Sequence, residues 1–514
     1  MVDAREYHDR TNHTPRSVRE DGVRLDRATK PRPYKVYEDR PHVAPPGDPE
    51  APETPALAAV ACSRADPTAD IDRRSEEPIL HALCHYAAGV TKELEMGGRT
   101  MRFRAASCTG KLYHVDLYAV ADDRGTLDAG VYHFDPHTDG FDVLREGDYR
   151  GVLADAAGGQ AGVAAAPVTF VLTSEWWRNA WKYRERTYRH AFWDSGTIIA
   201  NLLAVAHGGN RRTEVVTSFA DGPVARLLGV APDVEAPLEL VPVGSEAPAP
   251  GARDVAAIDP ETVPVSERVE EYPLVPDAWR GSSLPDGAAA REWREQAGTA
   301  GAVGTHSPGD GERVALDPVD AETASARPVG TTIERRGSLR EFDHEPISGR
   351  TFATVLDRAL HGVPTDVYGA ADAPGDGVGR LVDAYCLVHA VEGIEQGTYQ
   401  YHPGETALER VGDTDRGTAG HLALDQSVVG DAAANVYLMA DVDAIVEELG
   451  DRGYRLAQLL GGIALGRLYL ATYAHLGLGG RGFTFYDGLV TEHLSPRAAN
   501  QAPMTLFAFG KADK

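Results

Sequence analysis

Two arginines and a serine near residue 335 form a pattern suited to binding a phosphate. The segment reads Glu334-Arg335-Arg336-Gly337-Ser338-Leu339-Arg340-Glu341-Phe342 and precedes a helix predicted over 348–360. Guanidinium groups supply charge and paired donors, and a serine hydroxyl adds a neutral donor. An ordinary basic turn on the surface is the alternative, although the chain as a whole is strongly acidic. The candidate phosphate ligands are Arg335, Arg336, Ser338 and Arg340.

A second candidate segment is a loop of small residues that leads into a predicted strand. It reads Ala105-Ala106-Ser107-Cys108-Thr109-Gly110-Lys111-Leu112-Tyr113. Backbone donors can approach the edge of a planar ligand closely where side chains are this small. A plain entry into a strand fits the same residues, so the loop alone does not decide between the two.

The chain repeats itself at an offset of about 266 residues. Glu185-Arg186-Thr187-Tyr188-Arg189 opens a long apolar helix, and Asp451-Arg452-Gly453-Tyr454-Arg455 opens another. Downstream, Ser218-Phe219-Ala220-Asp221-Gly222 matches Phe485-Tyr486-Asp487-Gly488. Several matches in one order at nearly constant offset predict two homologous domains in one chain.

The predicted organisation is a polar N-terminal arm (1–55), a first domain (56–244), a linker (245–330) and a second domain (331–514). The linker is rich in Ala, Gly, Pro, Asp and Glu, with a short helix expected near 288–296. Each domain combines strands with one buried helix, over 191–206 and 456–476, and ends in a strand. The segment 477–480 predicts a helix cap and turn. The expected class is α+β, with the two halves packed through helices.

Composition excludes several classes of partner. The chain has 77 acidic and 51 basic residues, a net charge of −26, and few lysines, which is typical of a halophilic surface. It has no basic stripe for nucleic acid or an anionic membrane. It has no apolar run of the roughly 18 residues that a membrane span needs, so we expect a cytoplasmic protein. The four cysteines are scattered, and we expect no metal.

The two candidate segments resemble motifs of the FMN-dependent nitroreductase superfamily. Arg335 to Phe342 is similar to its N-terminal phosphate motif. Ser107 to Tyr113 with Asp116-Leu117-Tyr118, and Tyr183 to Arg189 with Ala200 to Leu203, resemble motifs of its SagB/ThcOx dehydrogenase branch. The resemblance covers 56–244 and 331–511. It implies a nitroreductase-like fold, a mainly antiparallel sheet flanked by helices, duplicated as a single-chain pseudo-dimer.

In that superfamily FMN lies between two subunits, so the resemblance implies a composite site inside this chain. The second copy would hold the phosphate through Arg335, Arg336, Ser338 and Arg340, with Lys511 after its last strand. The first copy would lay Ser107, Thr109 and Gly110 against the flavin ring.

The opposite site has lost the matching residues. Near 58–66 the chain keeps at most one arginine and a serine, and near 374–381 it has no serine and carries Asp376. An acid there would repel the anionic cofactor. We therefore predict one FMN per chain and one degenerate site.

Lys182 and Tyr183 resemble the lysine–tyrosine pair of branch members that oxidise azolines to azoles in peptides. That reaction removes a carbon-bound proton and passes a hydride to flavin N5. A tyrosine whose pKa is lowered by a neighbouring ammonium can be the base. A solvated Lys182 and a Tyr183 that packs the start of the helix fit the same residues.

Three functions follow from the resemblance and stay open. The first is a SagB/ThcOx-type FMN dehydrogenase, with a small molecule or modified peptide as substrate and a cyclodehydratase as a possible partner. The second is a generic NAD(P)H-dependent reductase of nitro compounds or quinones. The third is a non-catalytic partner subunit of a peptide-modifying complex, in which both sites have decayed.

Overall fold

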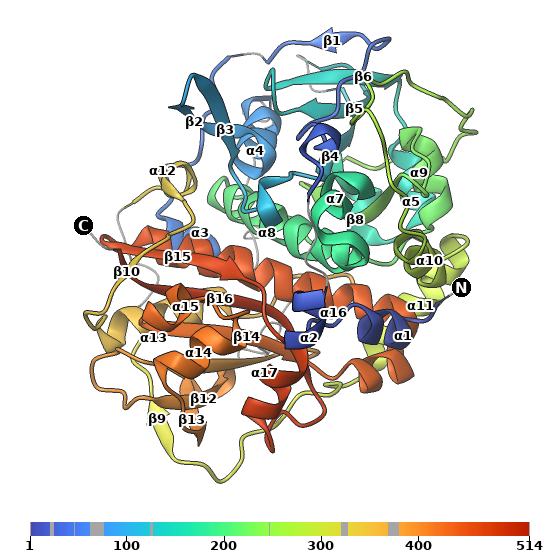
Figure 1. Ribbon diagram of the computed structural model, residues 1–514. Helices are drawn as coiled ribbons and strands as arrows, with labels where there is room; N and C mark the ends of the chain where they lie inside the picture. The colour runs from blue at the N-terminus through green and yellow to red at the C-terminus, as the bar shows by residue number, and fades with distance from the viewer. Residues whose placement is uncertain are drawn as a thin grey trace.

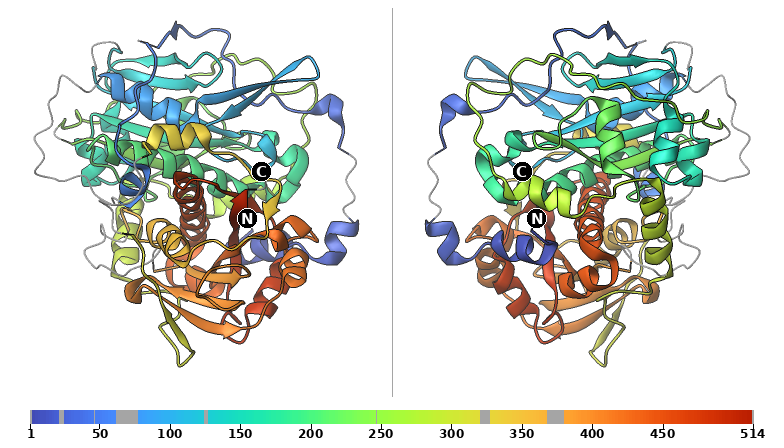
Figure 2. Two further views of the ribbon diagram at one scale, coloured as in Figure 1. Left: turned by 90° about the vertical axis from the view of Figure 1, so that its left-hand side faces the viewer. Right: turned by 90° about the vertical axis from the view of Figure 1, so that its right-hand side faces the viewer.

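The computed structural model describes residues 2–20, 25–45, 47–61, 77–123, 127–245, 247–319, 327–367 and 380–512. It contains one large antiparallel sheet in the N-terminal half (residues 2–245) and another in the C-terminal half (residues 247–512). Two long helices, α8 (Thr187–Gly208) and α16 (Val442–Ala474), run between the halves (Figures 1 and 2). The predicted α+β class with mainly antiparallel sheets is confirmed.

The two sheets share one strand order, as a duplication predicts. The N-terminal sheet runs β6-β5-β4-β7-β8, and the C-terminal sheet runs β13-β12-β11-β14-β16. The strands of the first are β4 (Val115–Ala121), β5 (Gly130–Asp135), β6 (Gly140–Glu146), β7 (Val168–Glu175) and β8 (Glu235–Val243). Those of the second are β11 (Asp383–Val388), β12 (Gly397–His402), β13 (Ala407–Gly412), β14 (Ala434–Ala440) and β16 (Ala502–Ala512).

Short strands extend the sheets at their edges. β1 (His42–Val43), from the N-terminal arm, pairs with β6, and β9 (Arg313–Ala315) pairs with β13. β10 (Phe342–Asp343) and β15 (Leu478–Phe483) both pair with β16. β2 (Val90–Met96) and β3 (Arg99–Arg104) form a separate hairpin just before the small-residue loop.

The remaining helices cover the sheets and the junction. In the N-terminal half they are α1 (Ala4–Arg10), α2 (Pro15–Glu20), α3 (Ala56–Ala61), α4 (Glu77–Ala88), α5 (Arg150–Ala156), α6 (Ala161–Ala165), α7 (Trp176–Tyr183) and α9 (Asp221–Leu228). In the C-terminal half they are α10 (Leu274–Gly281), α11 (Gly287–Thr299), α12 (Val329–Arg335), α13 (Gly349–Ala359), α14 (Arg416–Leu422), α15 (Ser427–Asp431) and α17 (Asp487–Leu494). Helix α13 begins after an N-cap at Ser348, close to the prediction.

Helices α8 and α16 approach each other closely because glycines lie where they cross. A Cβ added to Gly196 would lie 2.4 Å from the carbonyl carbon of Gly462, and one added to Gly462 would lie 2.4 Å from the carbonyl oxygen of Phe192. These two glycines are themselves related by the repeat, since 462 − 196 = 266. The helices therefore cross at equivalent points, as in an isologous dimer interface.

Two buried ion clusters flank this crossing, and the repeat relates them. Arg186 and Arg189 of α8 bind Asp487 at 3.0 and 2.7 Å. Their counterparts Arg452 and Arg455 of α16 bind Asp221, each at 2.7 Å. Each half thus supplies two arginines to the aspartate of the other. All six side chains are at most 4% exposed.

The arm and the segment predicted as a linker reach these clusters. The carbonyl oxygen of His13, in the arm, accepts from the Asp487 N–H, and that of Leu284 accepts from the Asp221 N–H. Tyr7 of the arm is fully buried, and Trp279 and Trp293 of the other segment are nearly so. Both segments therefore carry more core than their composition predicts.

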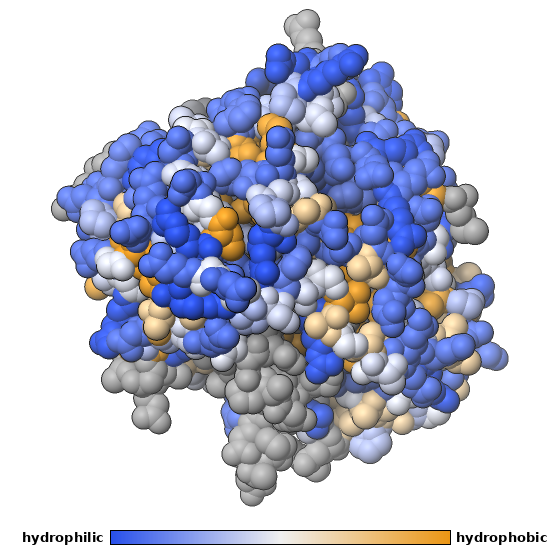
Figure 3. Space-filling view, turned by 90° about the horizontal axis from the view of Figure 1, so that it is seen from below, coloured by the Kyte–Doolittle hydropathy of each residue, from blue (hydrophilic) through white to orange (hydrophobic). Residues whose placement is uncertain are grey.

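The face seen from below is mainly hydrophilic, with scattered hydrophobic spots (Figure 3). Among the helices that the structure describes, none combines the length and apolarity of a membrane-spanning helix.

We predict that Asp487→Ala lowers the free energy of unfolding by about 3–5 kcal/mol, because it leaves Arg186 and Arg189 buried without their anion. Urea denaturation of the full chain at neutral pH measures this. The matched control is Asp443→Ala, which removes an exposed ion pair with Arg5 and should cost less than about 1 kcal/mol.

The same pair of variants gives a pH test. Burial raises the pKa of Asp487, but Arg186 and Arg189 outweigh it and hold that pKa well below its usual range. Its contribution is therefore present above the unfolded-state pKa of about 3.9 and lost as pH falls below it. The stability difference between wild type and Asp487→Ala should shrink in acid; a constant difference would contradict the assignment.

Candidate functional site

The structure brings the two candidate segments together at the junction of the halves. Arg336 follows α12, and its guanidinium donates to the carbonyl oxygens of Ala105 (3.0 Å) and Arg104 (2.8 Å) in the N-terminal half. The Tyr469 ring of α16 lies 5.6 Å from the same guanidinium. Segments more than 200 residues apart in sequence therefore meet at one place.

The other predicted phosphate residues lie around Arg336 but differ from it. Arg335, Ser338 and Arg340 are exposed, and within the described ranges their side chains have no hydrogen-bond or ion-pair partner. Lys511, in β16 opposite Asp343 of β10, pairs with Glu345 at 3.0 Å. The free donors suit a phosphate, whereas Arg336 already joins the two halves.

The small-residue loop is held in an unusual conformation. Gly110, Lys111 and Tyr113 all have positive φ, at 65°, 59° and 48°. Asp194 of α8 stabilises the loop by accepting from the Thr109 N–H (2.9 Å), the Thr109 hydroxyl (2.8 Å) and the Cys108 thiol (3.1 Å). Burial and the neighbouring Asp194 raise the pKa of Cys108, so the thiol stays protonated.

Sequence reasoning missed Asp194. It also contacts His114 Nε2 at 3.0 Å, and His114 Nδ1 lies 2.8 Å from the Ser174 hydroxyl. The sequence signal that could have indicated it was an aspartate within the predicted, mainly apolar helix over 191–206. Its counterpart in the second copy is Leu460, since 460 − 194 = 266, so this anchor exists in one half only.

Tyr183 lies against the same loop, but its pKa is shifted in the direction opposite to the one predicted. A Cβ on Gly110 would lie 2.8 Å from the Tyr183 hydroxyl. Burial raises the pKa of Tyr183, Asp194 and Cys108 raise it further, and Arg481 opposes them. Lys182 Nζ lies 4.9 Å from the centre of the Tyr183 ring, above its face. The expected lowering of the Tyr183 pKa by Lys182 is therefore wrong for this arrangement.

Arg481 is a further residue that sequence reasoning missed. Gly477 to Gly480 predict a cap and turn, whereas Leu478 to Phe483 form strand β15. The Gly480 carbonyl oxygen accepts from the Leu339 N–H at 3.2 Å, which joins β15 to the phosphate segment. Arg481 lies in this strand, and its positive charge opposes the rise in the Tyr183 pKa.

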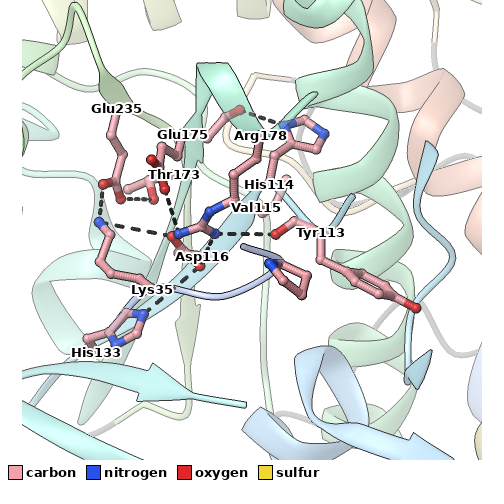
Figure 4. Close-up of polar contacts among 12 residues, drawn as sticks. Lys35, Tyr113, His114, Val115, Asp116, His133, Thr173, Glu175, Arg178 and Glu235 are labelled. Atoms are coloured by element: carbon pink, nitrogen blue, oxygen red, sulfur yellow. Dashed lines mark hydrogen bonds and ion pairs between the residues drawn. The ribbon is translucent and has the colours of Figure 1, made fainter. Parts of the chain in front are cut away.

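A buried polar network supports the loop from behind (Figure 4). Lys35 of the arm forms ion pairs with Glu235 and, at 4.0 Å, with Asp116. Arg178 binds Asp116 at 2.9 Å and donates to the Tyr113 carbonyl oxygen at 3.3 Å. The arm therefore stabilises the site indirectly, which its composition did not reveal.

A pocket opens beneath the loop. It is small, and its lining includes Arg104, Ser107, Cys108, Tyr113 and Asp194. The residues predicted for the degenerate site, 58–66 and 374–381, fall largely on 62–76 and 368–379, which lie outside the described residues.

Comparison with known proteins identifies the family. A protein of Methanocaldococcus jannaschii, named as a nitroreductase, is 30% identical over 179 residues, which are 34% of this chain and 87% of the relative. The chain belongs to the nitroreductase family. No protein-family model matches it.

One solved structure shares the fold of this nitroreductase-family chain over its whole length. The crystal structure of a protein from Anabaena variabilis, named as a nitroreductase, matches with a TM-score of 0.77 over 99% of both chains, at 22% identity. The likeness therefore extends over both halves and shows the fold alone. A Ralstonia eutropha structure covers 42% of this chain and 94% of its own, with a TM-score of 0.31 and 19% identity.

We predict that Asp194→Ala releases the small-residue loop. Hydrogen bonds to a charged acceptor contribute about 1.5–3 kcal/mol each, so amide exchange at Thr109 should rise by at least about tenfold. Hydrogen–deuterium exchange with peptide mapping measures this. The control is Asp135→Ala, which removes the acceptor of a distant turn at His137 and Thr138. Equal exchange at the loop in wild type and Asp194→Ala would contradict the anchor.

Proposed function

We propose that the chain is an FMN-dependent oxidoreductase that holds one flavin where its two halves meet. The observation that carries this proposal is the pair of hydrogen bonds from Arg336 to the carbonyl oxygens of Arg104 and Ala105. These hydrogen bonds hold the segment that carries Arg335, Ser338 and Arg340 close to the small-residue loop. The chain also belongs to a family of nitroreductases. A flavin phosphate fits Arg335, Ser338 and Arg340, with Lys511 nearby, because guanidinium groups and a hydroxyl supply charge and hydrogen-bond donors to phosphate oxygens.

The residues of the N-terminal half fit the ring of the flavin. Ser107, Thr109 and Gly110 offer a small, rigid surface that Asp194 holds in place. The bound flavin would supply hydride transfer, and the protein would supply orientation and proton control. This placement of ring and phosphate follows the family resemblance.

One flavin per chain is supported by the repeat itself. The loop anchor Asp194 and the site residue Tyr183 have apolar counterparts, Leu460 and Leu449, since 449 − 183 = 266. The second junction therefore lacks both the acid that holds the loop and the phenol beside it.

The finer assignment concerns what the flavin oxidises or reduces. As a SagB/ThcOx-type dehydrogenase, the chain would oxidise azolines in a modified peptide, with a cyclodehydratase as partner, and Tyr183 would be the base. The raised pKa of Tyr183 favours the alternative, an NAD(P)H-dependent reductase of nitro compounds or quinones, because a protonated phenol donates a proton rather than removing one.

Flavin content tests the main proposal. We expect protein reconstituted with FMN in molar salt to retain about one flavin per chain, as its family fold and single anchored loop imply. Arg336→Ala should lose most of it, whereas Arg350→Ala, which removes an exposed arginine paired with Asp317, should not. Two flavins per chain would contradict the single site. A chain that binds none would favour the non-catalytic partner subunit.

Tyr183→Phe distinguishes the two reactions. If Tyr183 is the base of azoline oxidation, its loss should lower that rate by about 10²–10⁴-fold, and the wild-type rate should rise toward alkaline pH as the phenol ionises. Reduction of the flavin by NAD(P)H, a hydride transfer that needs no base, should change far less. Single-turnover rates of flavin reduction by an azoline peptide and by NAD(P)H measure both. An unchanged azoline rate would rule out Tyr183 as the base.

A further inference from the structure

We infer that His114 takes up one proton when the flavin of the proposed site is reduced, as part of a hydrogen-bonded unit of Asp194, His114 and Ser174 behind the small-residue loop. This inference rests on the proposed flavin site, because it assigns the group that balances charge there. His114 acts through Asp194 and the loop, so it is a positioning residue and does not touch the flavin.

The unit connects the small-residue loop to the N-terminal sheet. Asp194 of α8 accepts from the Thr109 N–H at 2.9 Å, and its carboxylate lies 3.0 Å from His114 Nε2. His114 Nδ1 lies 2.8 Å from the hydroxyl of Ser174, in β7. His114 and Ser174 are fully buried, and Asp194 is 4% exposed. A change of charge on the His114 ring therefore acts strongly on the loop, because little water screens it.

The counterpart of His114 in the second copy follows from strand register. Strands β4 and β11 pair with β7 and β14 in equivalent registers, with Ala121 opposite Val168 and Val388 opposite Ala434. The offset is 266 for the second strand of each pair (434 − 168) and 267 for the first (388 − 121). Position 114 therefore corresponds to Leu381, since 381 − 114 = 267.

Apolar side chains replace the whole unit in the second copy. Asp194 and Ser174 correspond to Leu460 and Ala440, since 460 − 194 = 266 and 440 − 174 = 266. Leu381, Leu460 and Ala440 are each at most 1% exposed. The fold is therefore satisfied by an apolar core at this place. Because burying polar groups costs free energy, their presence beside the anchored loop indicates a role beyond folding.

The carboxylate of Asp194 requires a compensating charge when the flavin gains electrons. Asp194 accepts from Thr109 and Cys108, as an ionised carboxylate does. Among the described residues, no lysine or arginine forms an ion pair with Asp194, and its basic partner is His114. A hydride adds one negative charge to the flavin on the other side of the loop, and two negative charges in a site with little water repel each other. A proton on His114 leaves the Asp194–His114 pair without net charge and removes that repulsion.

The unit can accept this proton without losing a hydrogen bond. In the neutral ring, Nε2–H donates to Asp194 and Nδ1 accepts from the Ser174 hydroxyl; in the cation, Nδ1–H donates to the same oxygen, because the hydroxyl rotates. A proton on Asp194 itself would displace one of the donors that its oxygens accept. The step balances, since the reductant and solvent together give the flavin two electrons and one proton, and solvent gives His114 the other proton.

The other ionisable groups at the loop do not gain a proton. Burial and Asp194 raise the pKa of Cys108, and burial raises the pKa of Tyr183, so both already hold their protons. Burial lowers the pKa of His190 well below its usual range, so this ring stays neutral.

The charged groups on the side of α7 include one rival site for the proton. Arg178 binds Asp116 at 2.9 Å and Glu175 at 2.6 Å, close to His114 (Figure 4). Arg178 keeps its charge, since a guanidinium does not lose its proton in proteins. Burial raises the pKa of Glu175, and Arg178 opposes the rise. Glu175 is therefore the residue whose contribution has to be separated from that of His114.

The pH dependence of the flavin midpoint potential counts the protons taken up at equilibrium. The FMN-loaded full chain is titrated with dithionite and redox dyes around neutral pH, where an imidazole can change its charge. In wild type, two protons for two electrons should change the equilibrium constant of reduction a hundredfold per pH unit, which is about 59 mV. His114→Gln, which cannot become a cation, should take up one proton, so the change should be tenfold per pH unit, about 30 mV.

The near-ultraviolet spectrum of the reduced flavin shows whether the second proton is on the flavin. We expect the spectrum of the reduced anion in wild type and in His114→Gln. The matched control is His402→Gln, because His402 is also buried against a carboxylate, that of Glu409 at 2.8 Å, but lies in the C-terminal sheet. This control should keep the wild-type slope. Ser174→Ala, which removes the acceptor of Nδ1–H, should move the loss of the second proton to lower pH, and it serves as the test if His114→Gln fails to fold.

Three results would overturn the inference: a one-proton slope in wild type, an unchanged slope in His114→Gln, or the spectrum of the neutral reduced flavin in wild type. Loss of the second proton in Glu175→Gln but not in His114→Gln would also overturn it, because the proton would then belong to Glu175. Absence of a flavin spectrum after reconstitution would instead show failure of the proposed function.

Discussion

The structure depends on two buried arginine–aspartate clusters, in each of which two arginines of one half form ion pairs with an aspartate of the other. A buried aspartate without its arginines, or buried arginines without their aspartate, would be strongly unfavourable. Separation of the halves would therefore either expose these charges to water or leave them buried without a partner. Because Arg186 and Arg189 come from one half and Asp487 from the other, and the second cluster reverses the roles, the halves are fixed in one orientation. The crossing glycines of α8 and α16 then fix their separation.

This rigid junction is what allows a site to be divided between the halves. Arg336 reaches the loop at Ala105 only because α12 and α16 are held against the N-terminal half. The fold is nearly symmetric, but the chemistry is not: Asp194, Tyr183 and Lys182 have Leu460, Leu449 and Glu448 as counterparts. The residues that form the interface are thus repeated in both halves. The polar residues suited to a cofactor are not repeated, so they occur at one junction.

Much of the fold could be predicted because the repeat and the hydrophobic pattern are local signals. The buried helices and the final strands follow from periodicity, and the arginines of α8 and α16 follow from the repeat. The roles of the arm and of 245–330 could not be predicted, because burial of Lys35 or Trp293 depends on distant partners rather than on local composition. Arg481 was missed because its glycine-rich strand is formed only by pairing with β16. The Tyr183 pKa could not be predicted because it depends first on burial, and then on Asp194 and Cys108, which the fold brings close to the phenol.

The most direct test of a single composite site is a crystal structure of the full chain grown with excess FMN. We predict one flavin per chain, with its phosphate at Arg335, Ser338 and Arg340 and its ring against Ser107, Thr109 and Gly110. Density for a flavin at the other junction, at both junctions, or within one half alone would contradict it.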